Sequence, residues 1–103
     1  MALKGVIGLV STTNTPAIAS ATTALVANTG RTGFLIQNLG TNPLFVRFGA
    51  GASSTVFNVV LAGGTVNDNG TGGLFAQTEG IVYTGVITIA GTGPRYTITE
   101  FYE

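Results

Sequence analysis

Short apolar segments recur along the chain, and clusters of glycine and asparagine separate them. No segment keeps the i, i+3, i+4, i+7 spacing of apolar residues that an amphipathic helix needs over three turns. Threonine and valine, which favour the pleated surface of a sheet, are abundant, and the 16 glycines supply turns. This succession of short strands and turns is typical of an all-β sandwich or barrel.

The segments predict a single all-β domain, a β-sandwich of jelly-roll or Greek-key type with about eight short strands. The expected strands lie at residues 6–11, 23–26, 34–38, 44–48, 56–61, 74–76, 81–90 and 95–102. Residues 81–90 form the longest of them, and Gly85 inside that strand predicts a β-bulge. Because only the turn GTGP separates the last two strands, we expect them to form a β-hairpin.

The N-terminal part carries a weaker pattern than the rest of the chain. The stretch STTNTPAIASATTA, which begins at Ser11, is small and polar and predicts a loop or an extended arm. We therefore divide the chain into residues 1–25, an N-terminal arm or peripheral strand, and residues 26–103, the β-sandwich domain. Gly5 and Gly8 interrupt the short apolar start, which does not read as a signal peptide, so we expect a cytoplasmic product.

Charged residues make up only 8% of the chain, against about 25% in typical proteins. The basic residues are Lys4, Arg31, Arg47 and Arg95, and the acidic residues are Asp68, Glu79, Glu100 and Glu103. Their zero net charge removes the long-range repulsion that keeps proteins soluble as monomers, so we expect a component of an assembly. The basic residues form no cluster for a phosphate backbone, and no apolar run approaches the ~18 residues of a membrane span. We expect no nucleic-acid or membrane partner.

The chain contains neither histidine nor cysteine, which removes the common nucleophile–base pairs and thiolate metal sites. Glu100 and Glu103 lie three residues apart, which in a strand places them on opposite faces. Asp68 and Glu79 lie in turn-like segments, so we expect all four carboxylates to be solvated rather than to form an acid/base pair. The sequence therefore predicts that the protein is not an enzyme, with no catalytic residues and no cofactor.

Three glycine-rich stretches resemble ligand loops but lack essential parts of them. Residues 67–73, NDNGTGG, have the alternating oxygen side chains of a calcium loop, yet hold one carboxylate and no following bidentate glutamate. Residues 49–51 and 91–93 contain only a fragment of a phosphate-binding motif, and no helix is expected after either of them. We interpret all three as turns and expect no metal site.

Most of the aromatic residues alternate with polar residues, as core side chains do. Phe45 shares a strand face with Arg47, and Phe101 lies on the last expected strand. Because aromatic residues and arginine are enriched at protein interfaces, we select Phe45, Arg47 and Phe101 as candidate interface residues.

Two stretches of the chain resemble small virion proteins of tailed bacteriophages. The first covers residues 31–61 and contains FLIQN and NPLFVRFG, followed by VVLAGG. The second covers residues 73–103 and contains IVYTG and a closing TITE. Proteins of this kind occur as capsid decoration (cement) proteins, minor head proteins or small fibre-associated proteins, so the resemblance implies a structural role without catalytic residues.

The resemblance and the low charge together predict a capsid decoration protein, made in the host cytoplasm and located on the capsid surface of the virion. Its expected partners are the major capsid protein and further copies of itself, with a trimer as the favoured homo-oligomer. Two alternatives stay open: a tail- or fibre-associated module that recognises a host glycan through residues 67–73, and a head–tail accessory protein. A high copy number per virion would favour the decoration role, whereas a low copy number would favour one of the two alternatives.

Overall fold

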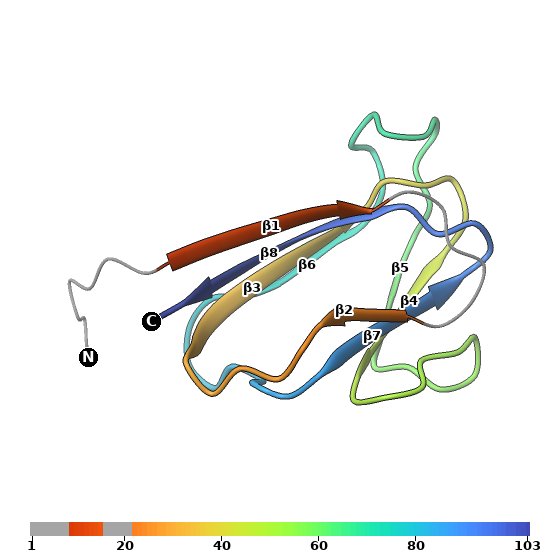
Figure 1. Cartoon of the computed structure of the whole chain (residues 1–103). Coiled ribbons are helices and arrows are strands. Elements are labelled where there is room, and N and C mark those ends of the chain that lie inside the picture. The colour runs from red at the N-terminus through yellow and green to blue at the C-terminus, as the bar shows by residue number, and fades with distance from the viewer. Residues whose placement is uncertain (1–8, 16–21) are drawn as a thin grey trace.

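The computed structural model describes residues 9–15 and 22–103, and within these ranges the chain forms eight β-strands (Figure 1). They make two four-stranded sheets in which every strand is antiparallel to its neighbours. The all-β sandwich expected from the sequence is therefore confirmed. The strands are β1 (Leu9–Thr15), β2 (Thr22–Leu25), β3 (Arg31–Asn38), β4 (Leu44–Phe48), β5 (Val59–Leu61), β6 (Leu74–Gln77), β7 (Ile87–Gly91) and β8 (Tyr96–Tyr102).

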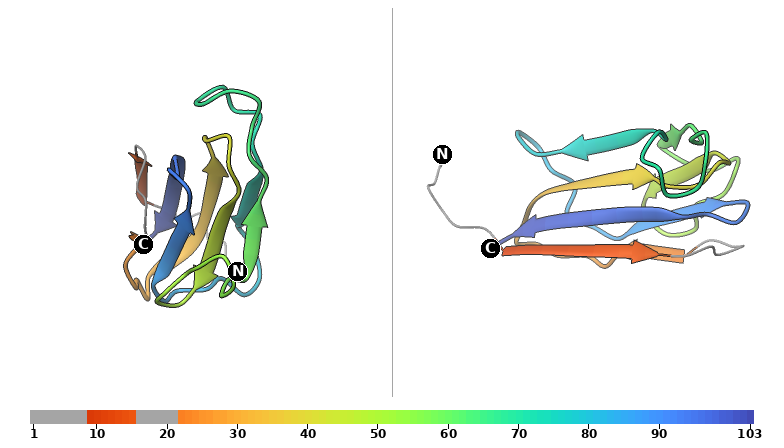
Figure 2. Two further views of the ribbon diagram at one scale, coloured as in Figure 1. Left: turned by 90° about the vertical axis from the view of Figure 1, so that its right-hand side faces the viewer. Right: turned by 90° about the horizontal axis from the view of Figure 1, so that it is seen from above.

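The order of the strands is that of a jelly roll. Sheet A has the order β1-β8-β3-β6, and sheet B has the order β2-β7-β4-β5. The pairs β1/β8, β2/β7, β3/β6 and β4/β5 are therefore nested within one another, and successive pairs alternate between the two sheets. A long antiparallel ribbon that folds over itself gives this arrangement, and its two sheets are those of an eight-stranded jelly roll. Seen from above, sheet A presents its four strands side by side (Figure 2, right).

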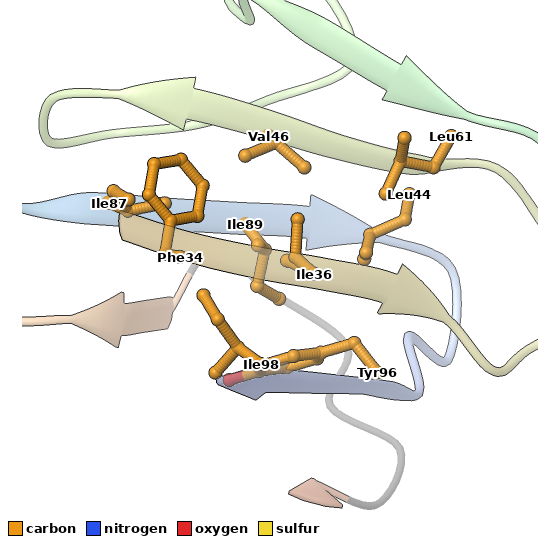
Figure 3. Close-up of a cluster of buried hydrophobic side chains, with 9 residues drawn as sticks. All are labelled: Phe34, Ile36, Leu44, Val46, Leu61, Ile87, Ile89, Tyr96 and Ile98. Atoms are coloured by element: carbon orange, nitrogen blue, oxygen red, sulfur yellow. The ribbon is translucent and has the colours of Figure 1, made fainter. Parts of the chain in front are cut away.

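Alternate side chains from both sheets meet between the layers and form the core (Figure 3). Phe34 and Ile36 of β3 and Ile98 of β8 have no exposed surface. The buried cluster consists of Phe34, Ile36, Leu44, Val46, Leu61, Ile87, Ile89, Tyr96 and Ile98. Burial of each large apolar side chain contributes about 1.5–3 kcal/mol, so this layer provides the main driving force for folding.

Strand β3 begins on a buried charge, Arg31, whose side chain is fully enclosed. Its Nε donates to the carboxylate of Glu100 at 2.9 Å, within sheet A. Its terminal nitrogens donate to three backbone carbonyls in the loops that lead out of β2 and into β7. These acceptors belong to Val26 (2.7 Å), Tyr83 (2.8 Å) and Gly85 (3.0 Å). The guanidinium therefore joins sheet A to the loops of sheet B at one end of the sandwich.

Strand β3 ends on a second buried polar side chain, Asn38, which is 1% exposed. Its amide nitrogen donates to carbonyls of Asn42 (2.8 Å), Leu61 (3.0 Å) and Ala62 (3.2 Å), and its oxygen accepts from the backbone of Gly40 at 2.8 Å. Because Leu61 belongs to β5, this amide links β3 to sheet B at the opposite end from Arg31. Both ends of β3 are thus tied across the sandwich.

The prediction that residues 81–90 and 95–102 form a β-hairpin is wrong. β7 covers only Ile87–Gly91 and lies in sheet B between β2 and β4, whereas β8 lies in sheet A between β1 and β3. Each strand already has a neighbour on both sides, so neither has a free edge for the other. Residues 81–86 lie outside any strand because carbonyls of this segment accept hydrogen bonds from Arg31. Gly85 is one of these acceptors and not a bulge within a strand.

Several strand boundaries also differ from expectation. The polar residues 11–15, expected in a loop or arm, belong to β1, which pairs with β8 in an unbroken register. The strand expected at 56–61 shortens to β5, because Ser53 and Val56 exchange backbone hydrogen bonds in a tight turn. Within the described ranges the longest strand is β3, with 8 residues, and the strand expected at 44–48 coincides with β4.

The structure places the described parts of the N-terminal region at the periphery of the sandwich. β1 is an edge strand of sheet A and β2 an edge strand of sheet B. Residues 6–8 of the first expected strand, and most of the polar stretch that follows β1, lie outside the described residues. The division of the chain at residue 25 stays a prediction.

Replacing Arg31 with methionine tests the importance of the buried guanidinium. Arg31→Met keeps the apolar stem but leaves the carboxylate of Glu100 and three carbonyls without this donor. We expect the free energy of unfolding to fall by about 3–5 kcal/mol, because the partner charge stays buried without compensation. Urea denaturation followed by circular dichroism measures the loss. The control Arg47→Met, on β4, should change stability by about 0.5 kcal/mol or less, and equal losses in both variants would contradict the assignment.

Candidate functional site

The outer face of sheet A is uncharged along the middle of β3, β6 and β8. Since Phe34, Ile36 and Ile98 point into the core, their neighbours in the strands point outward. These outward residues are Leu35 and Gln37 of β3, Leu74 and Ala76 of β6, and Thr97, Thr99 and Phe101 of β8. They align in rows across the sheet: Leu35 lies opposite Ala76 and Thr99. The face thus offers apolar and hydroxyl-bearing side chains for contact with another surface.

The outer face of sheet B differs, because it contains a groove of about 400 Å³. The β4–β5 connection lies against this face: the backbone nitrogen of Ala52 donates to the hydroxyl of Thr88 on β7 at 3.0 Å, and Ala52 is buried. The groove lies between this connection and the turns before β4 and after β7. Its lining residues are Asn42, Pro43, Phe45, Ala52, Ser53, Ser54, Ala90, Gly91 and Thr92.

An exposed apolar cluster adjoins the groove on sheet B. The rings of Phe45 and Phe57 lie 5.2 Å apart between centroids, at 49° to each other. Val60 lies opposite Phe45 in the pairing of β4 with β5. Val56, Phe57 and Val60 are each 40–48% exposed, a large fraction for apolar side chains. The edge of sheet B at β5 is therefore apolar as well.

The three candidate interface residues do not come together. Phe45 and Arg47 point outward from β4 on sheet B, whereas Phe101 points outward from β8 on sheet A. A single flat contact cannot include both faces of a sandwich, so the three residues belong to two different surfaces. Phe101 belongs to the uncharged face of sheet A, where its ring lies beside Gly33 of β3. Phe45 lines the groove of sheet B.

The expectation that all carboxylates are solvated is wrong for Glu100. This residue is buried, and its carboxylate accepts hydrogen bonds from Arg31 at 2.9 Å and from Asn28 at 3.3 Å. These contacts give Glu100 a structural role in closing one end of the sandwich. Across the described ranges, no three histidine, cysteine or acidic side chains lie close enough together to hold a metal ion. No helix in this part of the chain is long and apolar enough to cross a membrane.

The loop between β5 and β6 is held by its own side chains. Asn69 donates to Thr65 at 2.9 Å and accepts from the hydroxyl of Thr71 at 2.7 Å, and that hydroxyl also accepts from the backbone of Thr65. Asp68, which has a positive φ of 64°, forms an ion pair with Arg95 at 2.6 Å. The polar groups that a calcium ion or a glycan would need from residues 67–73 are thus largely engaged within the protein.

The ion pair between Asp68 and Arg95 gives a pH-dependent prediction. The hydrogen bond from Arg95 lowers the pKa of Asp68 below its ordinary value. The pair therefore stabilises the folded protein above the ordinary pKa of about 4, and this contribution is lost as the pH falls through the lowered value. We expect carbon-detected NMR titration to find a lowered pKa for Asp68 in the natural protein and an ordinary one in Arg95→Gln. Arg47→Gln is the control and should keep the lowered value; an unchanged titration in Arg95→Gln would refute the pairing.

Comparison with known proteins identifies no relative of this chain. No protein-family model, no curated protein and no solved structure matches it. The jelly-roll assignment therefore depends on the strand order described above, and the resemblance of residues 31–61 and 73–103 to phage virion proteins stays a prediction from the sequence.

Proposed function

We propose that this protein is a structural component of a bacteriophage particle, a capsid decoration protein that attaches through the outer face of sheet A. The observation that carries the proposal is the uncharged character of that face, from Leu35 at its centre to Leu74 and Phe101 toward its margins. Charged side chains are strongly depleted from the cores of protein interfaces, and aromatic side chains are enriched there.

The pairing of charges within the molecule supports the proposal. Arg31 pairs with Glu100 inside the sandwich, and Arg95 pairs with Asp68 on its surface. The first pair removes two of the eight charged residues from the surface, and in the second pair two exposed charges compensate each other. Such a surface loses little hydration energy when it is covered, because desolvation is costly chiefly for charged and polar groups.

Adhesion through apolar and hydroxyl-bearing surface is the proposed mechanism. Removal of apolar area from water contributes about 25 cal/mol per Å², and a stable contact needs about 800 Å² from each partner. Many copies on one shell, each also in contact with further copies, resist its expansion together even when each contact is modest. The major capsid protein and further copies of this chain are the partners that this mechanism requires.

The alternative of glycan recognition through residues 67–73 receives no support from the loop geometry. Asn69 and Thr71 bond to Thr65 and to each other, and Asp68 bonds to Arg95. A sugar would have to compete with these contacts, which costs affinity. The third candidate, a head–tail accessory protein, uses the same kind of contact surface and differs in copy number alone.

Attachment is tested with purified shells that lack the protein. Leu35→Lys places a charge at the centre of the sheet A face, and we expect the affinity for shells to fall at least about tenfold, as for a central contact residue. Co-sedimentation at several protein concentrations measures it. Val60→Lys introduces the same charge on sheet B, where Val60 is 48% exposed, and should leave attachment unchanged.

Two results would count against the proposal. Equal loss in Leu35→Lys and Val60→Lys would show that attachment does not proceed through sheet A. Failure of the natural protein to bind shells, together with a copy number of a few per virion by quantitative mass spectrometry, would remove decoration and favour the accessory role. Circular dichroism of both variants confirms that they are folded.

A further inference from the structure

We propose that the groove on the outer face of sheet B is a binding site for a neutral carbohydrate ring. It lies on the opposite outer face from the one proposed for attachment, so it does not depend on that function. It is also separate from residues 67–73, since none of them lines it. The groove combines an apolar floor, an unpaired polar rim, fixed walls and an uncharged lining.

The floor of the groove is formed by Phe45 of β4 and Ala90 of β7, which lie opposite each other in the pairing of these strands. The ring of Phe45 is held in place by Phe57, 5.2 Å away between centroids. A pyranose presents one face made of C–H groups, which is apolar and packs well on the electron-rich face of an aromatic ring. Phe45 therefore offers an aromatic ring, beside the small side chain of Ala90, for such a face to pack against.

The rim of the groove carries hydroxyl and amide groups that are available for hydrogen bonds. Among the described residues, the side-chain hydroxyls of Ser54 and Thr92 have no hydrogen-bond partner. Asn42 uses its amide nitrogen to donate to the carbonyl of Thr92 at 3.1 Å, which leaves its side-chain oxygen as an acceptor directed by that bond. Sugar hydroxyls both donate and accept, so they match a mixed rim of this kind.

The walls of the groove are fixed before any ligand arrives. The hydroxyl of Thr88 accepts from the backbone of Ala52 at 3.0 Å and donates to the carbonyl of Gly49 at 2.7 Å. These bonds hold the β4–β5 connection against the sheet. In the same connection, Ser53 and Val56 exchange backbone hydrogen bonds. A pre-formed wall reduces the entropy lost on binding, which matters most for weak ligands such as single sugars.

The absence of charge selects the class of ligand. None of the residues that line the groove is acidic or basic. An anionic ligand such as a phosphate or a uronic acid would lose hydration without gaining a charged partner, which is unfavourable. The volume, about 400 Å³, lies at the small end of the range for ligand pockets, about 300–1,000 Å³, and suits a short saccharide.

Saturation-transfer NMR on the full chain tests the proposal. The probes are methyl glycosides of glucose, galactose and N-acetylglucosamine at millimolar concentration, with glucuronate as the charged comparison. We expect saturation transfer to at least one neutral glycoside, strongest at the protons of its C–H face, and none to glucuronate.

Three variants locate the site. Phe45→Leu removes the aromatic floor and should lower the affinity at least about fivefold. Ser54→Arg, at an exposed position of the rim, should abolish binding without disturbing the core. Phe101→Leu is the matched control on sheet A and should bind as the natural protein does.

Each other outcome overturns the proposal. No saturation transfer to any neutral glycoside would show that the groove does not bind sugars. Equal transfer to glucuronate would contradict the selection for a neutral ligand. Binding that survives in both Phe45→Leu and Ser54→Arg would place the sugar elsewhere on the protein.

Discussion

Strand β3 is fixed to the opposite sheet at both ends by buried polar side chains, and the rest of the sandwich depends on this constraint. Arg31 reaches the loops of sheet B at one end, and Asn38 reaches β5 at the other. A shift of β3 by one residue would turn Phe34 and Ile36 out of the core and leave these polar groups without partners, at a cost of about 1–3 kcal/mol for each unsatisfied group. The register of β3 is therefore strongly determined, and it sets the register of β6 and β8, which pair with it on either side.

Local sequence patterns predict the strands correctly where neighbouring residues alone determine the strand. The strand at 44–48 coincides with β4, because Leu44 and Val46 alternate with outward residues and Pro43 precedes them. The expected hairpin failed because pairing in a jelly roll is nested: β8 pairs with β1, at the other end of the sequence, although a short turn connects it to β7. The expectation that Glu100 is solvated failed for a similar reason, since its partner Arg31 is 69 residues away in the sequence. Alternation shows which side chains share a face, but not which sheet or which distant charge they meet.

The same limit applies to the candidate site. Phe45, Arg47 and Phe101 are candidates because aromatic residues and arginine are enriched at interfaces, and the structure places all three at outward positions of their strands. The assignment of these residues to two opposite surfaces required the topology. The groove could not be predicted from the topology alone, because its walls come from the turns at residues 42–43 and 91–92 and from residues 52–54. The nearest sequence signal is the glycine-containing stretch at residues 49–51, which predicts a turn. It gives no sign that Thr88, far along the chain, holds the neighbouring Ala52 against the sheet.

The difference between the two outer faces has one structural origin. The connection from β4 to β5 closes the nested ribbon, and it lies against sheet B because Ala52 and Gly49 bond to Thr88. Sheet B therefore cannot present an uninterrupted surface, but it gains a walled groove beside Phe45. In sheet A, strands β3, β6 and β8 carry rows of uncharged side chains across the outer face. Attachment through a broad face requires uninterrupted area, whereas recognition of a small ligand requires walls, and the fold separates these two requirements on opposite sides. A molecule that attaches through sheet A consequently keeps the groove of sheet B open to solvent.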